Sequence, residues 1–349
     1  MPAYTSQYFG GVATISVATF ANLPASGTTD ERIAITGESA LFDTTTYPAI
    51  VRWGGSAWQL ESCAATYLNV AAVEFASGTW TGTGGTVGTR SDATVLDTTY
   101  NESWVWNTTN SLFVPDYLGA ITIANQKRIK GDSLTLEAGW TATQTYSGTG
   151  GLATLTTDGS KLTFYANGAA TVVNSSVVNF NDADRTTTSN FYMKCLLARA
   201  TDSNWSGAPS DPTRICFFFE YITVPSTTTG RVVAFGDGDT TTGTGLSFPG
   251  KFFQRNTSRG ISAINGHANR GGIFTTETLV QFRIISGTSA QVKIGNGSWH
   301  DLAVSNCGLP TGSTSFFSGT TFTFGVDATS YTTNKAQGTL RYLQAIRYT

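Results

Sequence analysis

Two segments of the chain repeat one arrangement of aromatic residues around a short turn. Residues 41–58 read LFDTTTYPAIVRWGGSAW, and residues 96–113 read LDTTYNESWVWNTTNSLF. Each contains Asp-Thr-Thr, at Asp43 and at Asp97, followed by a tyrosine and then by tryptophans that flank a turn. A lone hairpin is only marginally stable in water, so the large apolar face of such a hairpin must be covered. The repeat therefore predicts two related β-hairpins that need a packing partner.

The first repeat predicts a tight hairpin around its two glycines. If Gly54 and Gly55 form a two-residue turn of the primed type, Trp53 pairs with Ser56 and Val51 pairs with Trp58. Both tryptophans and Val51 then lie on one face of the hairpin.

The second repeat predicts the same hairpin with two more residues in its loop. A loop at residues 107–110 pairs Trp106 with Ser111 and Trp104 with Phe113. The predicted aromatic faces either pack on each other, pack against other copies of the chain, or form the ordinary core of one monomeric domain. The residues of these candidate assembly faces are Val51, Trp53, Trp58, Trp104, Trp106 and Phe113.

Composition favours strands throughout. Charged residues make up 13% of the chain, against about a quarter in average proteins, and 38 glycines occur among 349 residues. Good helix formers are scarce, whereas β-branched and aromatic residues are common. We therefore expect an all-β protein.

Charge and hydropathy bear on the partners. A net charge of −2 offers no basic footprint for nucleic acid. No window approaches the roughly 20 apolar residues that span a bilayer, and the first residues lack the pattern of an export signal. We expect no nucleic acid partner, no membrane insertion and no ordinary export signal. The four cysteines, at 63, 195, 216 and 307, form no C-x-x-C pair and are expected to be free and mostly buried.

Strand-like runs follow one another at regular spacing from about residue 132 to the end. This rhythm is typical of an antiparallel β-sandwich or jelly roll. The run RICFFFEYITV, residues 214–224, alternates little and is expected to be a central strand. The basic stretch around Lys127, Arg128 and Lys130 is interpreted as a connector. The expected domains are residues 1–75 with the first hairpin, 76–131 with the second hairpin and connector, and 132–349 as the sandwich.

Catalytic chemistry has little support in the sequence. The only histidines are His267 and His300, and no G-x-S-x-G motif is present. Asp237 and Asp239 could chelate a metal, but an Asp-Gly turn explains them better; Asp182 and Asp184 are interpreted in the same way. Glu220 lies in an apolar run, and a glycosidase needs two carboxylates. We expect no enzyme activity, no cofactor and no metal.

Aromatic residues near turn-like sequence are the remaining candidates for function. A flat ring could stack on a sugar beside polar Asn and Asp side chains, although packing at the core or its rim is the ordinary role of such residues. The candidate glycan contacts are Trp140, Trp205, Phe253, Trp299 and Tyr331.

The repeated Asp-Thr-Thr and tryptophan pattern, in residues 43–58 and 97–114, resembles small β modules of tailed-bacteriophage virion proteins, especially tail fibres. The preceding LPASGTTDERIAI, residues 23–35, is similar to the strand entry of such modules. In the last third, residues 290–304 (AQVKIGNGSWHDLAV) and the terminal GTLRYLQAIRYT resemble concanavalin-like or laminin-G-like sandwiches, without the metal ligands of those families.

The resemblance implies a virion structural protein, such as a homotrimeric tail fibre or similar appendage. Its N-terminal modules would bind other virion proteins, and its sandwich would attach to host-surface polysaccharide. The alternatives are a capsid decoration or head-fibre protein, a glycan-degrading hydrolase that uses Glu220 or Asp237 and Asp239, and a secreted lectin.

Overall fold

The computed structural model divides the chain into two compact units, residues 1–121 and 122–349. For several of the short strands in the second unit, only the backbone is described. The residues that the structure describes are 15–118, 121–146, 151–167, 174–199, 215–222, 233–236, 251–255, 261–263, 277–303, 317, 319–328 and 335–349.

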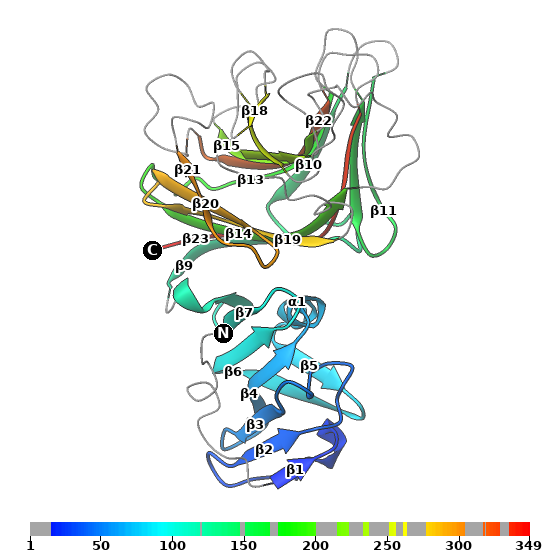
Figure 1. The fold of residues 1–349 in the computed structure, drawn as a ribbon, viewed down its shortest axis with the longest axis vertical. Helices are drawn as coiled ribbons and strands as arrows, with labels where there is room; N and C mark the ends of the chain where they lie inside the picture. Colours follow the sequence, from blue (N-terminus) through cyan, green and yellow to red (C-terminus); the bar gives the residue numbers. More distant parts are fainter. Residues whose placement is uncertain are drawn as a thin grey trace. The chain divides into compact units, whose positions relative to one another are not determined.

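The first unit is one mixed β-sheet with a helix (Figure 1). The strand order is β1-β2-β3-β4-β6-β7-β8, and β5 pairs with β6. The pairs β1–β2 and β4–β6 are parallel, and the other pairs are antiparallel. The strands are β1 Ile15–Val17, β2 Arg32–Ile35, β3 Ala49–Trp53, β4 Trp58–Ala65, β5 Thr79–Gly82, β6 Gly85–Asp97, β7 Glu102–Asn107 and β8 Leu112–Pro115, with 3-10 turns η1 Phe20–Asn22 and η2 Asp116–Leu118.

Helix α1 (Tyr67–Phe75) makes the parallel connection between β4 and β6 possible. Parallel neighbours need a crossover, and a helix is its usual form. Thr66 caps the helix start by accepting the backbone N–H of Asn69 at 3.4 Å, and Gly78, at φ +82°, follows its end. The all-β prediction included no helix here. It rested on overall composition, whereas the helix depends on a local run of alanine and valine between the capping residues Thr66 and Gly78.

The two repeats do form hairpins, β3–β4 and β7–β8, but the predicted registers were wrong. Trp53 lies opposite Trp58, and Trp106 lies opposite Phe113. Each tryptophan therefore faces an aromatic ring directly across the hairpin, with ring centroids 5.3 Å and 4.7 Å apart. The turn at Gly54 is longer than predicted, because the Gly54 N–H reaches the carbonyl of Ala57 at 3.0 Å.

All six residues of the predicted assembly faces are buried within the first unit. The Trp58 indole donates to the carbonyl of Pro24 at 2.8 Å, in the segment before β2. Trp104 instead packs beside Tyr67 of α1, with ring centroids 6.0 Å apart. Each hairpin is thus covered by a different segment of its own unit, which corrects the hypothesis that these faces join copies of the chain. They are ordinary core.

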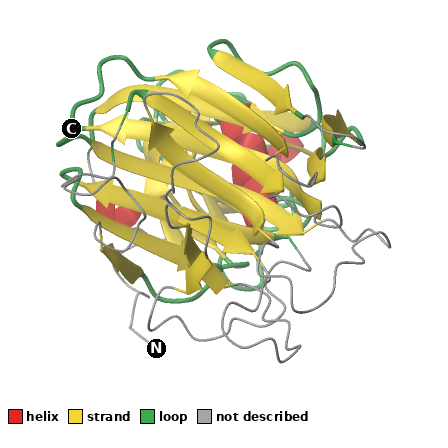
Figure 2. Cartoon of the chain, turned by 90° about the horizontal axis from the view of Figure 1, so that it is seen from above, coloured by secondary structure: helices red, strands yellow, loops and turns green. Residues whose placement is uncertain are grey.

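The second unit is an antiparallel β-sandwich, as predicted (Figure 1). Strands predominate in the part of the chain that the structure describes (Figure 2). One sheet has the order β10-β13-β22-β15-β16-β17-β18, and the other has the order β11-β12-β23-β14-β19-β20-β21, with β9 paired to β23. The strands are β9 Ile123–Lys130, β10 Trp140–Thr145, β11 Leu152–Thr157, β12 Leu162–Asn167, β13 Asn174–Asn181, β14 Asn190–Arg199, β15 Ile215–Ile222, β16 Val233–Gly236, β17 Lys251–Arg255, β18 Ile261–Ala263, β19 Thr278–Ile285, β20 Ser289–Ile294, β21 His300–Ala303, β22 Thr321–Ala328 and β23 Lys335–Tyr348.

Alternating side chains from the two sheets meet in one apolar core. Phe180 and Phe322 stack from one sheet at 5.0 Å between ring centroids, and Phe191 of the other sheet approaches Phe322 at 5.5 Å. β15 lies between β22 and β16, so the prediction of a central strand is confirmed. Along β19 and β20, residues in this core alternate with residues on the outer face of the sheet, among them charged residues. This alternation places the side chains of the candidate functional site on the outer face.

The predicted domain limits differ from the structure in two places. The limit at residue 75 falls inside a single sheet, because β4 and β6 on either side of it are hydrogen-bonded neighbours. The stretch around Arg128 is a strand and not a connector: β9 pairs with β23 over seven residues of the second unit. Both limits depend on pairing between strands that are distant in sequence. Local composition carries no information about such pairing.

Candidate functional site

The structure describes the side chains of two predicted glycan contacts, Trp140 and Trp299, and these two occupy different environments. Trp140 is buried in the sandwich core, 4.9 Å from the ring of Phe180, so its assignment as a sugar contact was wrong. Phe253 lies in β17, where only the backbone is described. Trp299 is half-exposed. The remaining candidates, which lie outside the described residues, are Trp205, Tyr331, Asp237 and Asp239.

Trp299 stands beside a charged partner on the outer face of the second sheet. The guanidinium carbon of Arg283 lies 4.5 Å from the centroid of the Trp299 ring, within the range of a cation–π contact. Arg283 comes from β19, and Trp299 comes from the turn that leads into β21. The guanidinium holds one face of the half-exposed indole, which fixes the orientation of the ring.

A polar ladder continues from Arg283 across three neighbouring strands. Arg283, Gln291 and Asp301 are direct partners in the register of β19, β20 and β21. Arg283 Nε donates to Gln291 Oε1 at 2.7 Å, and the same oxygen accepts from an Arg283 Nη. Gln291 Nε2 donates to Asp301 Oδ1 at 2.6 Å. The amide of Gln291 is therefore oriented by both neighbours.

Period-2 alternation explains why this ladder faces outward. Phe282 and Ile284 flank Arg283 in sequence and lie in the core, as do Ala290 and Val292 on either side of Gln291. Successive residues of a strand point to opposite faces of the sheet. Trp299 is presented by the turn after β20, which opens at Gly295 (φ +53°) and is closed by the Gly297 N–H on the Ile294 carbonyl at 3.0 Å.

The arrangement combines a fixed aromatic ring with a donor, an amide and a carboxylate. An indole face packs against the C–H face of a sugar, while guanidinium, amide and carboxylate groups make hydrogen bonds to hydroxyl groups. Asp301 is exposed and is the only carboxylate of these four residues. General acid–base cleavage of a glycosidic bond uses two carboxylates, and these four residues supply one.

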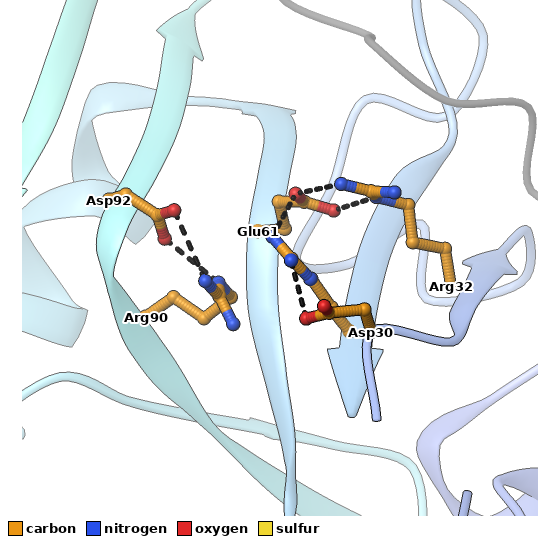
Figure 3. A network of polar contacts seen from close by, with 6 residues as sticks. Asp30, Arg32, Glu61, Arg90 and Asp92 are labelled. Atoms are coloured by element: carbon orange, nitrogen blue, oxygen red, sulfur yellow. Dashed lines mark hydrogen bonds and ion pairs between the residues drawn. The ribbon is translucent and has the colours of Figure 1, made fainter. Parts of the chain in front are cut away.

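A second charged cluster lies on the sheet of the first unit (Figure 3). Arg32 binds Glu61 through two hydrogen bonds of 2.7 and 3.0 Å, and Arg52 bridges Glu61 and Asp30. Nearby, Arg90 donates two hydrogen bonds, of 2.8 and 3.1 Å, to the Asp92 carboxylate. These hydrogen bonds hold the pKa of the Asp92 carboxyl below its usual value. Three arginines meet three carboxylates, so the cluster neutralises itself, and we assign it a structural role.

Three further titratable groups, Asp182, Cys63 and Cys195, are buried and have structural roles. Asp182 is buried, pairs with Arg347 at 3.0 Å and accepts from Asn125 at 2.8 Å, which ties β9 and β23 to the loop after β13. Cys63 and Cys195 are free and buried, as expected, and burial raises the pKa of both thiols. Within the described ranges no group of three or more His, Cys, Asp or Glu side chains could hold a metal ion.

The helices that the structure describes include none with the length and apolar character to cross a bilayer.

Comparison with known proteins gave matches to solved structures alone. No family model matches the chain. No curated protein matches it. The carbohydrate recognition domain of Emp47p aligns at 8% identity and a TM-score of 0.36, over 63% of this chain and 94% of that domain.

Two further solved structures align to a similar extent. The exoplasmic/lumenal domain of VIP36 in a Ca²⁺/Man-bound form aligns at 11% identity and a TM-score of 0.37, over 65% of this chain and 91% of that one. A protein of unknown function from Shewanella oneidensis MR-1, SO2946, aligns at 9% identity and 0.37, over 65% and 89%. Because these TM-scores are below 0.5, no ligand of these proteins is transferred to this chain.

Trp299 was among the candidates predicted from the sequence, whereas Arg283, Gln291 and Asp301 were not. Trp299 stood out because Asn296 and Asp301 flank it in a turn-like stretch. Arg283 and Gln291 lie 16 and 8 positions earlier, and only strand pairing brings them to the tryptophan. The alternation in QFRIIS and AQVKIG places Arg283 and Gln291 on the polar faces of their strands. The sequence did not show which strands pair, so it could not place these side chains beside Trp299.

Proposed function

We propose that this chain is a non-enzymatic attachment protein whose sandwich binds a surface polysaccharide through Trp299, Arg283, Gln291 and Asp301. The main support is the ordered row of these side chains across β19, β20 and β21. It presents a half-exposed indole beside a cationic donor, a neutral amide and an anionic acceptor. Such a surface suits a ligand with alternating C–H faces and hydroxyl groups.

Preorganisation supports a binding role for this row. Arg283 is held by Gln291, and Gln291 is held in turn by Asp301, so a ligand meets side chains whose rotamers are already fixed. Side chains that are ordered before binding lose less conformational entropy when the ligand arrives. β19 and β20 themselves are anchored in the core through Phe282 and Val292.

We further propose that the protein belongs to a bacteriophage virion, as a tail fibre or similar appendage, with the first unit as the part that joins other virion proteins. The support is the resemblance of the Asp-Thr-Thr and tryptophan repeats to virion modules, together with the compactness of residues 1–121 as a separate unit. The homotrimer implied by the resemblance is not part of this proposal, because the aromatic faces that motivated it are buried within one chain.

Removal of the ring tests the glycan site. The full chain is applied to an array of bacterial lipopolysaccharides and capsular polysaccharides, and Trp299→Ala is expected to lower affinity for the bound glycan about tenfold or more, because a central tryptophan is a frequent hot spot. Tyr117→Ala, which removes an exposed ring from the first unit, serves as the control and should bind like the wild type. Equal binding by wild type and Trp299→Ala would refute the assignment.

The hydrolase alternative predicts a different result on the same array. A depolymerase would release reducing ends from the glycan that it binds, and the wild type is expected to release none.

Localisation on purified virions by antibody labelling separates a tail appendage from a capsid decoration protein.

A further inference from the structure

β10 forms an edge of the sandwich among the strands that the structure describes. It is the first strand of its sheet, and β13 is its one partner among them. Trp140, at its start, is anchored in the core, but each of the next five residues, Thr141 to Thr145, is exposed. An edge strand presents a row of unpaired backbone N–H and C=O groups to which another strand can be added.

The usual devices that prevent edge pairing are missing from this strand. Natural edge strands are blocked by lysine, proline, bulges or very short length. Residues 138–157 contain no charged residue and no proline. The register of β10 against β13 runs through six consecutive pairs without a shift, so no bulge turns the strand away. The edge is regular, neutral and six residues long.

Exposed apolar side chains gather around the same edge. In the described part of the second unit, four large apolar side chains are exposed, and three of them lie within residues 134–152. Leu134 precedes β10 and is 52% exposed, Tyr146 follows it and is 59% exposed, and Leu152 begins β11 and is 44% exposed. β11 is itself the first strand of the other sheet, so both sheets end here in neutral sequence. Exposed apolar groups that cluster in this way mark interaction surfaces.

The pattern of side chains suits a second copy of the same strand. Thr141, Thr143 and Thr145 alternate and therefore share one face of β10. In an antiparallel pairing centred on Thr143, Thr141 of one copy lies opposite Thr145 of the second copy, and each Thr143 faces its equivalent. Cross-strand threonine pairs are favourable, and the absence of charge removes any like-charge repulsion.

We propose that two copies of the chain associate through β10, edge to edge and antiparallel, about a two-fold axis. A two-fold interface uses the same surface on both copies, which the central position of Thr143 allows. Pairing of a six-residue strand alone buries less than the roughly 1,200 Å² of a typical stable interface. Leu134 before β10, Tyr146 directly after it and Leu152 at the start of β11 supply additional exposed apolar area. The inference is independent of the glycan site, which lies on the strands β19 to β21.

Sedimentation velocity on the full chain tests this interface. The wild type is expected to sediment as a dimer, at twice the 37.0 kDa of the chain. The double variant Thr143→Lys/Thr145→Lys places the two lysines introduced at position 143 opposite each other and is expected to sediment as a monomer with an unchanged circular dichroism spectrum. Both side chains are exposed, and the substitution removes one hydrogen bond, which the Thr143 hydroxyl accepts from Asn179 at 3.3 Å. Tyr146→Glu, outside the strand, is a second variant with the same expected loss of the dimer.

A matched control adds the same two charges elsewhere. Thr108→Lys/Thr109→Lys alters two exposed threonines in the loop between β7 and β8 and should remain dimeric. A wild type that is a monomer or a trimer, or a Thr143→Lys/Thr145→Lys variant that stays dimeric while folded, would overturn the proposal.

Discussion

Trp104→Ala is expected to destabilise the first unit by about 3–5 kcal/mol, the usual cost of removing a fully buried large aromatic side chain. Trp104 is buried between Tyr67 of α1 and its cross-strand neighbours Val95 and Pro115. Neither the helix nor the sheet can move far enough to fill the resulting cavity, because both are fixed by hydrogen bonds. Of these, the Phe113 N–H donates to Glu74 of α1 at 2.7 Å.

Denaturant unfolding of the full chain, followed by circular dichroism and calorimetry, measures this effect. The two units are expected to give separable transitions, and only the transition of the first unit should shift. Trp299→Ala is the matched control, since it deletes the same side chain from a half-exposed position and should shift neither transition by more than about 1 kcal/mol. A Trp104→Ala protein that keeps its stability but changes its oligomeric state would restore the assembly hypothesis for the hairpins.

Asp97→Asn is expected to stabilise the first unit at neutral pH. Asp97 is buried at the end of β6, directly opposite the buried Glu102 of β7. Its Oδ1 accepts the backbone N–H groups of Thr99 and Tyr100 at 2.8 and 3.3 Å, and the Trp104 indole also favours the ionised carboxylate, but no hydrogen bond of ordinary geometry reaches the buried Oδ2. Burial raises the pKa of the Asp97 carboxyl to about 6, against 3.8 for the ordinary group.

The described part of the first unit offers no free cationic side chain to offset the cost of burying the ionised Asp97 carboxylate. Residues 1–121 contain three arginines and no lysine, against ten acidic residues, for a net charge of −7. All three arginines lie in the cluster of Figure 3, where they are bound to other carboxylates. The ionised Asp97 is therefore stabilised by backbone donors and the Trp104 indole and not by a cation.

The sign of the pH dependence follows from the raised pKa. Below about pH 4 both folded and unfolded chains hold the proton, so Asp97 adds no penalty. As pH rises from about 4 to 6 the unfolded chain releases the proton while the folded chain retains it. Stability therefore falls across this window, by about 3 kcal/mol in all for a pKa raised from 3.8 to about 6, and levels off above it. Asparagine keeps the acceptor oxygen without the charge, so the advantage of Asp97→Asn should grow from pH 4 to about pH 6 and stay constant to pH 7.5.

Asp43, the equivalent residue of the first repeat, supplies a control of opposite sign. Hydrogen bonds from the Thr45 and Thr46 hydroxyls, at 2.6 and 2.7 Å, lower the pKa of the Asp43 carboxyl. Its ionised form is favoured in the folded chain, so Asp43→Asn should destabilise above the ordinary pKa and lose this effect in acid. If Asp97→Asn were less stable than the wild type at pH 7.5, or if its effect did not vary with pH, the account of Asp97 would be wrong.

Local patterns predicted much of the fold, and the parts they missed depend on pairing between distant segments. The strand at Ile33 and Ile35, the two hairpins, the central strand at Phe217 and the antiparallel sandwich all follow from residue type and alternation. The hairpin registers were wrong because the two glycines suggested a two-residue turn. In the structure, the aromatic pair Trp53 and Trp58 sets the register.

The candidate site shows the same limit. Trp140 and Trp299 look alike in sequence, since each is an isolated tryptophan near a turn. Trp140 starts an edge strand whose first position faces the opposite sheet, whereas Trp299 lies in a turn on the outer face. Which face a turn residue occupies depends on the sheet around it, so composition could not separate the two.

The most direct test of the glycan site is a titration of the tryptophan indole N–H resonances in a ¹H–¹⁵N spectrum of the full chain. The titrant is the polysaccharide that binds most tightly on the array, cut to a soluble oligosaccharide, and the Trp299 signal is assigned by its loss in Trp299→Ala. We predict that the Trp299 signal shifts as the site saturates while those of the buried Trp104 and Trp140 stay in place. A titration that saturates without moving the Trp299 signal would contradict the proposed site.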